Sequence, residues 1–146
     1  MSNINKESIQ KTLSILNRYG VDKINIRSIG GGKTTNTIFP MNESENILKH
    51  IESINSEANI YITFNYFKIS NNEAISDNDI ERIKFILLDI DPERPSGTAS
   101  TDKQKEEAKR VFDNCLQYLE DNSIQYYYTF DSGNGYHALI PIDIEC

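Results

Sequence analysis

Residues 83–91, with the sequence IKFILLDID, join an apolar run to two acidic residues. Such a run is typical of a strand buried on both faces, so we expect a central strand here. The segment DPERPSGTAST that follows is rich in Pro, Gly and Ser and predicts a loop. Because side chains alternate along a strand, we expect Asp89 and Asp91 to share one face of the sheet, roughly 6 to 7 Å apart.

Two carboxylates at that spacing repel each other, and a bound divalent cation relieves the repulsion. Mg²⁺ and Mn²⁺ prefer hard oxygen ligands of this kind. Asp89 and Asp91 are therefore candidate metal ligands. The alternative is that two acids simply begin a polar loop, and an Asp-x-Asp motif alone does not decide between these interpretations.

The residues after the loop predict a helix and then a hairpin. Thr101 and Gln104 match a capping box, and apolar residues at helical spacing continue to about Asp121. The segments IQYYYTF (124–130) and YHALIPI (136–142) predict two strands. They are joined by DSGNG, in which Asn-Gly is a strong signal for a two-residue hairpin turn.

The same turn is a candidate nucleotide site, formed by Ser132, Gly133, Asn134 and Gly135. Its two glycines lack a β-carbon, so a nucleotide can approach the backbone N–H groups closely. His137 begins the returning strand, where it is placed to donate to a phosphate oxygen. A lone histidine in a strand is also an ordinary packed or half-exposed residue, and spacing alone leaves both interpretations open.

The first half of the chain predicts a smaller α/β unit. The pattern favours a helix over 6–19, a hairpin of strands 23–29 and 37–41, a helix capped by Asn42 or Ser44, a strand over 59–67 and a polar loop or boundary over 68–79. His50 is expected on the surface of the second helix. "YYY" at 126–128 is expected to pack within a strand.

The glycine-rich segment GGGKTT (30–35) does not match a phosphate-binding P-loop, because Arg27 stands where the first glycine belongs. A hairpin turn explains the glycines better. Arg27 and Lys33 remain candidates for contact with a nucleic-acid phosphate.

The bulk composition narrows the classes of function. With 146 residues and a formal net charge of −7, the chain predicts one acidic domain that does not coat nucleic acid non-specifically. Cys115 and Cys146 form no disulfide framework, which indicates a reducing, cytoplasmic setting. No apolar run approaches the ~18 residues of a membrane span, so no membrane partner is expected.

Taken together, the two motifs resemble the archaeo-eukaryotic primase superfamily, in the form of the primase-polymerase domains of phages, plasmids and integrated mobile elements. The resemblance rests on FILLDIDPERPSGTASTD (85–102) and YTFDSGNGYHALIPID (128–143), with weaker support from NIYITFN (59–65). It covers residues 58–146. Two motifs in this order, with one helix between them, are more specific than either motif alone.

The resemblance implies an α/β (α+β) fold in a single domain over 1–146. An N-terminal α/β module would span 1–70, and a partial RRM-like sheet of the catalytic core would span 80–146. It implies that Asp89 and Asp91 hold Mg²⁺ or Mn²⁺, and that His137 contacts the triphosphate in a pocket shaped by Ser132 and the adjacent glycines. The implied partners are nucleoside triphosphates, a DNA template and a helicase or further domain of the same replication system.

One departure from the family pattern keeps other functions open. Family members carry a third motif, an apolar residue followed by Asp, and nothing after the hairpin matches it. Asp143 shares a strand face with His137 but stands in the wrong place for this ligand. The chain is then expected to be either a portion of a larger protein or a short form. The alternatives to a primase-polymerase function are an inactive nucleotide- or nucleic-acid-binding module and a metal-dependent nuclease.

Overall fold

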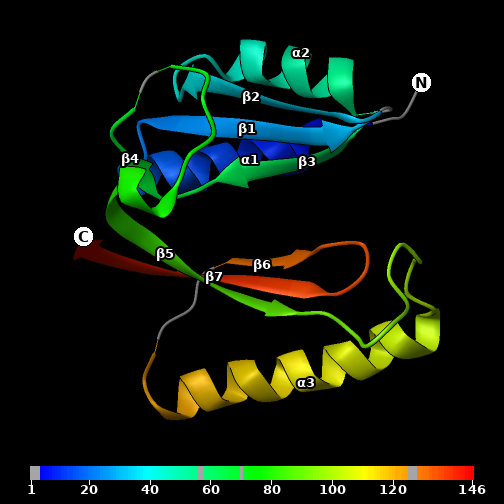
Figure 1. The fold of residues 1–146 in the computed structure, drawn as a ribbon. Coiled ribbons are helices and arrows are strands. Elements are labelled where there is room, and N and C mark those ends of the chain that lie inside the picture. Colours follow the sequence, from blue (N-terminus) through cyan, green and yellow to red (C-terminus); the bar gives the residue numbers. More distant parts are fainter. Residues whose placement is uncertain (1–3, 56–57, 70, 125–127) are drawn as a thin grey trace. The chain divides into compact units, whose positions relative to one another are not determined.

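The protein has a mixed α and β fold, as predicted (Figure 1). The computed structural model describes residues 4–55, 58–69, 71–124 and 128–146. Its elements are, in order, α1 (Lys6–Arg18), β1 (Lys23–Gly30), β2 (Lys33–Pro40), α2 (Ser44–Ile54), β3 (Asn59–Thr63), β4 (Tyr66–Phe67), η1 (Asp77–Asp79), β5 (Ile80–Ile90), α3 (Asp102–Asp121), β6 (Tyr128–Asp131) and β7 (Tyr136–Glu145). None of the helices in the described residues has the length and apolar character needed to cross a membrane.

The chain divides into two compact units. Unit 1 comprises residues 1–84 and 143–146, and unit 2 comprises residues 85–142. The boundaries fall within β5 and within β7, so both strands contribute residues to each unit.

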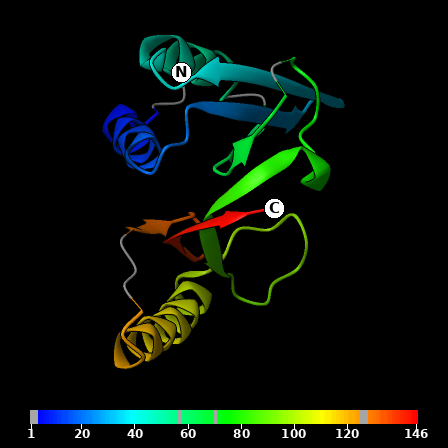
Figure 2. The same cartoon turned by 90° about the vertical axis from the view of Figure 1, so that its left-hand side faces the viewer.

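Unit 1 is built on a three-stranded antiparallel sheet in the order β2-β1-β3. Helices α1 and α2 cover one face of this sheet (Figures 1 and 2). Ile24 and Ile26 of β1 are fully buried, because they face the two helices, and so are Leu16 of α1 and Ile47 of α2. The apolar faces of the two helices and the buried face of β1 together form the core of unit 1.

The helix predicted over 6–19 and the predicted hairpin are present in unit 1, but the second strand of the hairpin, β2, begins at Lys33 and not at residue 37. The side chain of Asn5 caps α1 by accepting from the Ser8 N–H at 3.0 Å, and the β1–β2 hairpin turns at Gly31 and Gly32, both of which have positive φ. The predicted cap of α2 is wrong: its N-cap residue is Glu43, whose side chain makes no capping hydrogen bond. The surface position predicted for His50 is also wrong, since its ring is half-buried with its centroid 5.2 Å from that of Phe39.

The strand predicted over 59–67 is broken in two. β3 pairs with β1, whereas β4 pairs with β5. The break falls at Phe64 and Asn65, and the Asn65 Oδ1 atom accepts a hydrogen bond from the Lys84 N–H at 2.9 Å. The alternation of apolar and polar residues continues across Phe64 and Asn65. Periodicity alone therefore did not show that this segment forms two strands in different sheets.

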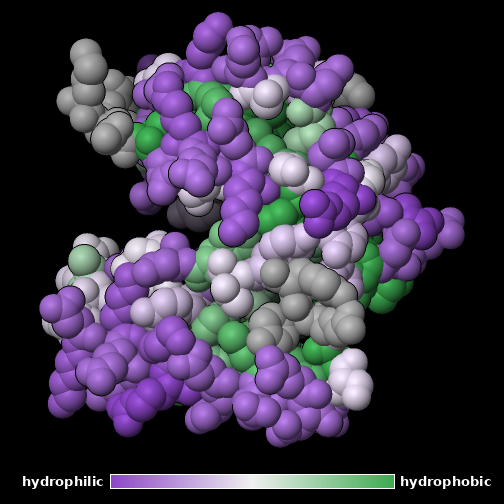
Figure 3. All heavy atoms as spheres, turned by 180° about the vertical axis from the view of Figure 1, so that it is seen from behind, coloured by the Kyte–Doolittle hydropathy of each residue, from purple (hydrophilic) through white to green (hydrophobic). Residues whose placement is uncertain are grey.

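The second sheet has the order β4-β5-β7-β6. Within unit 2, α3 packs on one side of it, where Phe112 stacks on Tyr136 with ring centroids 5.6 Å apart (Figures 1 and 2). The predicted capping box of α3 is confirmed by reciprocal hydrogen bonds between Thr101 and Gln104. The exposed side chains of α3 are mostly polar or charged, and the lower edge of Figure 3, where α3 lies, is mainly purple. Residues 125–127 of the predicted strand IQYYYTF lie outside the described residues, and β6 begins at Tyr128.

The prediction that β5 is buried on both faces is wrong. Phe85 is 1% exposed, but Ile86 is 50% exposed and Leu87 is 39% exposed, and these neighbours point to opposite faces. Strands buried on both faces belong mostly to parallel sheets covered by crossover helices, whereas the described strand pairs here are antiparallel.

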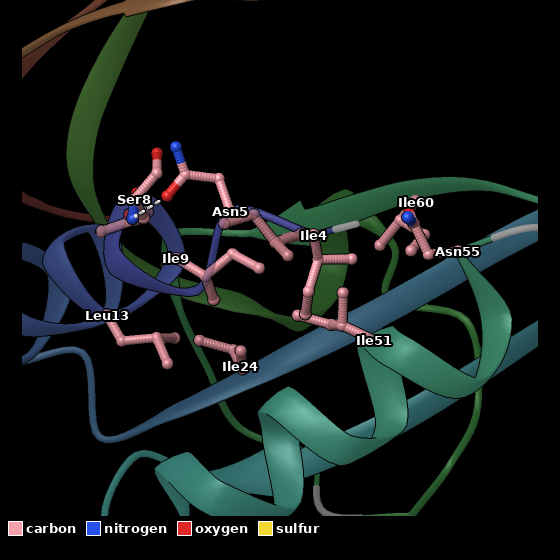
Figure 4. A pocket seen from close by; sticks show the side chains of 11 residues that line it. Ile4, Asn5, Ser8, Ile9, Leu13, Ile24, Ile51, Asn55 and Ile60 are labelled. Carbon is pink, nitrogen blue, oxygen red and sulfur yellow. Dashed lines mark hydrogen bonds between the residues drawn. The ribbon is translucent and has the colours of Figure 1, made fainter. Parts of the chain in front are cut away.

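A cavity of about 460 Å³ lies in unit 1 between the helices and the sheet. Figure 4 shows Ile9 and Leu13 of α1 and Ile24 of β1 gathered on one side of it. Its lining is mainly isoleucine, with Asn5, Ser8, Thr12 and Asn55 as polar members. None of the candidate site residues lines this cavity.

Candidate functional site

The two sequence motifs meet in unit 2 through Asp89 and His137. The Nε2 atom of His137, on β7, lies 3.0 Å from the Oδ1 atom of Asp89, on β5. With its proton on Nε2, the imidazole donates a hydrogen bond to the carboxylate. Both side chains remain accessible, since Asp89 is 52% exposed and His137 is 32% exposed. Two residues predicted from separate motifs are thus neighbours at one site.

Asp91 follows directly on the end of β5, beside the backbone of Gly135. A β-carbon added at Gly135 would collide with the carbonyl oxygen of Ile90 and the Oδ1 atom of Asp91. Only glycine permits this approach, because every other residue carries a β-carbon. The hairpin loop and the acidic motif are therefore packed against each other at Gly135.

The predicted hairpin is present, but its turn is longer than Asn-Gly indicates. Asp131 pairs with Tyr136, so the loop has four residues, 132–135. Its Ser132 N–H donates to the Gly135 carbonyl at 3.0 Å, and the Gly135 N–H donates to Ser132 Oγ at 2.9 Å. The Gly133 N–H donates to Asp131 Oδ1 at 2.8 Å. The N–H groups of Gly133 and Gly135 thus both donate hydrogen bonds within the hairpin. These bonds hold the shape of the loop, and the two N–H groups are already occupied.

Asn134 binds the loop between β5 and α3, which its position in a hairpin turn did not predict. Its side-chain Oδ1 accepts from the Ser100 N–H at 3.1 Å, and its carbonyl accepts from Ser100 Oγ at 2.8 Å. The same segment is held at a second point, where Gln104 Nε2 donates to the Glu93 carbonyl at 3.0 Å. The loop between β5 and α3 is therefore fastened to both the hairpin and the helix.

Arg94 is the functional candidate that the sequence interpretation missed. Its side chain is only 19% exposed, and its Nη2 atom lies 3.4 Å from Asp91 Oδ2. Nη1 donates to the Thr98 carbonyl at 2.5 Å, and the buried Nε atom has no hydrogen-bond partner among the described residues. The available signal was a single arginine three residues after Asp91, inside a loop treated only as a connection.

An ion pair flanks the hairpin on the side of α3. Lys105 Nζ lies 2.7 Å from Asp131 Oδ2 and 5.7 Å from the centre of the Tyr136 ring. The hydrogen bond from Lys105, together with that from the Gly133 N–H, holds the pKa of Asp131 below its ordinary value. The same bond raises the pKa of Lys105. Both groups are therefore charged at neutral pH, which keeps the base of the hairpin tied to α3.

The candidate nucleic-acid contacts belong to unit 1. Arg27 is exposed on β1 and pairs in register with Tyr61 of β3, so both side chains lie on the same sheet face. Lys33 is exposed at the start of β2 and pairs with Gly30, which by alternation places Lys33 on the other face of the sheet.

Asp143 is held by two basic side chains. Its Oδ1 atom lies 2.7 Å from Arg82 Nε and 3.0 Å from Lys84 Nζ, and these bonds lower the pKa of Asp143.

The donor set fits a divalent cation of a particular kind. Over residues 4–55, 58–69, 71–124 and 128–146, no three His, Cys, Asp or Glu side chains are grouped closely enough to hold a metal ion by themselves. Asp89 and Asp91 are each about half exposed. Mg²⁺ is commonly held by one or two carboxylates, with water and substrate phosphates completing its shell. Two accessible carboxylates suit that arrangement and do not suit an all-protein cage.

Comparison with known proteins adds no family. No protein-family model, curated protein or solved structure matches this chain.

Proposed function

We propose that this chain is a primase-polymerase type nucleotidyltransferase domain. It binds a nucleoside triphosphate together with Mg²⁺ or Mn²⁺ and serves DNA synthesis in the replication of a mobile element, in the cytoplasm. The observation that carries the proposal is the 3.0 Å contact between His137 Nε2 and Asp89 Oδ1. This contact supports one shared site for two motifs that lie before and after α3 in the sequence.

The arrangement suits phosphoryl chemistry. Such transfer needs mainly in-line positioning and neutralisation of charge. A divalent cation, when bound, supplies that neutralisation, and Asp89 and Asp91 are the residues that would hold it. His137 orients Asp89 through Nε2, and an arriving phosphate oxygen would compete with Asp89 for this N–H group. Gly135 keeps the hairpin close to Asp91, so the loop lies beside this carboxylate.

A second feature supports contact with single-stranded template. Arg27 and Tyr61 are exposed neighbours on one face of the unit 1 sheet, and Tyr61 is 51% exposed. A guanidinium beside an exposed aromatic ring offers both a phosphate contact and a surface on which a base can stack. Lys33 lies on the opposite face of this sheet, so the proposed template contact rests on Arg27 and Tyr61.

Product sizing on a gel tests the proposed activity. A labelled primer on a DNA template is incubated with Mn²⁺ and all nucleotides, with native protein and with Asp89→Asn/Asp91→Asn. The proposal predicts extension by native protein and none by the variant. Degradation of the primer would instead identify a metal-dependent nuclease. Nucleotide binding with neither product would identify a binding module and overturn the transferase assignment.

A further inference from the structure

Arg94 is unusual among the charged residues around the site because it is largely buried and poorly paired. Its side chain is 19% exposed in a loop whose other residues are mostly exposed. Burying a guanidinium is costly unless its donors are satisfied. Only Nη1 has a short partner, the Thr98 carbonyl, while Nε has none among the described residues.

The contact between Arg94 and Asp91 is a weak one. The Nη2 to Oδ2 distance is 3.4 Å, whereas charge-assisted hydrogen bonds are typically about 2.7 to 2.9 Å long. Moving this donor to another acceptor therefore gives up little. The planar guanidinium can bind phosphate through two parallel N–H groups, which an ammonium group cannot do.

We propose that Arg94 is a phosphate-binding residue that exchanges Asp91 for the phosphates of the incoming nucleoside triphosphate. This inference rests on the proposed function. Without nucleotide, Arg94 neutralises part of the charge of Asp91 and competes with a cation for that carboxylate. When a nucleotide arrives with its cation, Asp91 turns to the cation and the guanidinium turns to the phosphate. The hydrogen bond to the Thr98 carbonyl anchors the guanidinium during this exchange.

The exchange predicts effects of opposite sign, which a merely structural arginine would not produce. Arg94→Gln should bind Mn²⁺ alone more tightly than native protein, by roughly threefold, because an ion pair at Asp91 is removed. In the presence of Mn²⁺ it should bind a non-hydrolysable nucleoside triphosphate about tenfold more weakly, because charge-assisted contacts to phosphate are lost. Inorganic triphosphate should show the same weakening, since the residue contacts phosphate and not base or sugar.

The experiment measures free Mn²⁺ by electron paramagnetic resonance and nucleotide or triphosphate binding by calorimetry. Arg110→Gln, an exposed arginine on α3, is the matched control and should behave as native protein. Circular dichroism verifies folding. If Arg94→Gln does not fold, Arg94→Lys, which keeps the charge without the fork, replaces it and should also bind nucleotide more weakly than native protein. Native-like nucleotide affinity in each Arg94 variant that folds would overturn the role of Arg94 and leave the proposed function intact. Weaker binding of both Mn²⁺ and nucleotide would do the same. Failure of native protein to bind Mn²⁺ and nucleotide would overturn both proposals.

Discussion

The Nε2 atom of His137 lies 3.0 Å from the Oδ1 atom of Asp89, across the neighbouring strands β7 and β5. This contact joins the acidic motif to the hairpin motif. It fixes the orientation of one candidate metal ligand by a hydrogen bond from its neighbour, as residues around metal centres commonly do. The histidine thus has a measurable role before any nucleotide is bound.

Removal of His137 should weaken cation binding at Asp89. For His137→Ala we expect Mn²⁺ affinity to fall by about tenfold, because the carboxylate loses the group that orients it. His137→Gln, which keeps an N–H donor, should recover part of the loss. Electron paramagnetic resonance of free Mn²⁺ measures both. His50→Ala is the matched control, and an equal loss in that variant would remove the special role of His137.

Gly135 should tolerate no side chain. In Gly135→Ala the new β-carbon meets the Ile90 carbonyl oxygen and the Asp91 carboxylate. Because one of these contacts is with the backbone, we expect the upper end of the usual overpacking cost, about 3 kcal/mol. Urea unfolding measures the free energy of unfolding. Gly97→Ala is the control, because Gly97 has φ +76° but nothing within 4 Å of its added β-carbon. We expect only the backbone cost there, about 1 kcal/mol. The close approach at Gly135 would be refuted by equal or smaller destabilisation of Gly135→Ala.

His50 should make unit 1 sensitive to mild acid. Burial lowers the pKa of His50 from its ordinary value of 6.5, so between its folded pKa and 6.5 the unfolded chain binds more protons. Stability therefore rises with pH in this window and is lost as the pH falls through it. Thermal unfolding between pH 7.5 and about 5.5, above the range where most carboxylates titrate, should show a falling Tm.

The variant His50→Leu removes this titration. Its Tm should depend less on pH over the same range than the Tm of native protein does. A native pH dependence in His50→Leu would show that another group is responsible.

The pair of Arg27 and Tyr61 should contribute to binding of single-stranded DNA. Stacking of one base on an aromatic side chain is worth roughly 1 to 3 kcal/mol, so Tyr61→Ala should weaken binding by at least about fivefold. Arg27→Ala should also reduce the salt dependence of binding, by about one phosphate contact. Fluorescence anisotropy of a labelled oligonucleotide measures both. Lys11→Ala, an exposed residue of α1, is the control, and equal losses in all three variants would indicate non-specific attraction.

Local signals in the sequence predicted much of the fold. The capping box of Thr101 and Gln104 and the glycine turn between β1 and β2 depend on neighbouring residues, so pattern alone located them. The break at Asn65 depends on Lys84, which is distant in sequence. The exposure of Ile86 and Leu87 depends on what covers the sheet, and a strand's own residues carry no information about that.

The sequence identified candidate site residues but not the contacts that support them. Asp89 and His137 were singled out as an acid at the end of an apolar strand and a histidine after a glycine-rich hairpin turn, and the structure places them in contact. The parts played by Ser100 and Arg94 arise from contacts made by a loop, to Asn134 and Asp91 respectively. Loop contacts of this kind follow no periodicity, so no sequence pattern indicated them.

Calorimetric titration of a nucleoside triphosphate in the presence of Mn²⁺ tests the central claim most directly, that Asp89 and Asp91 form a metal and nucleotide site with His137. Native protein should give saturable heats that disappear in Asp89→Asn/Asp91→Asn. The control Glu106→Gln/Glu107→Gln removes the same amount of charge from exposed positions on α3 and should keep the heats. Equal heats from native protein and the Asp89→Asn/Asp91→Asn variant would contradict the account.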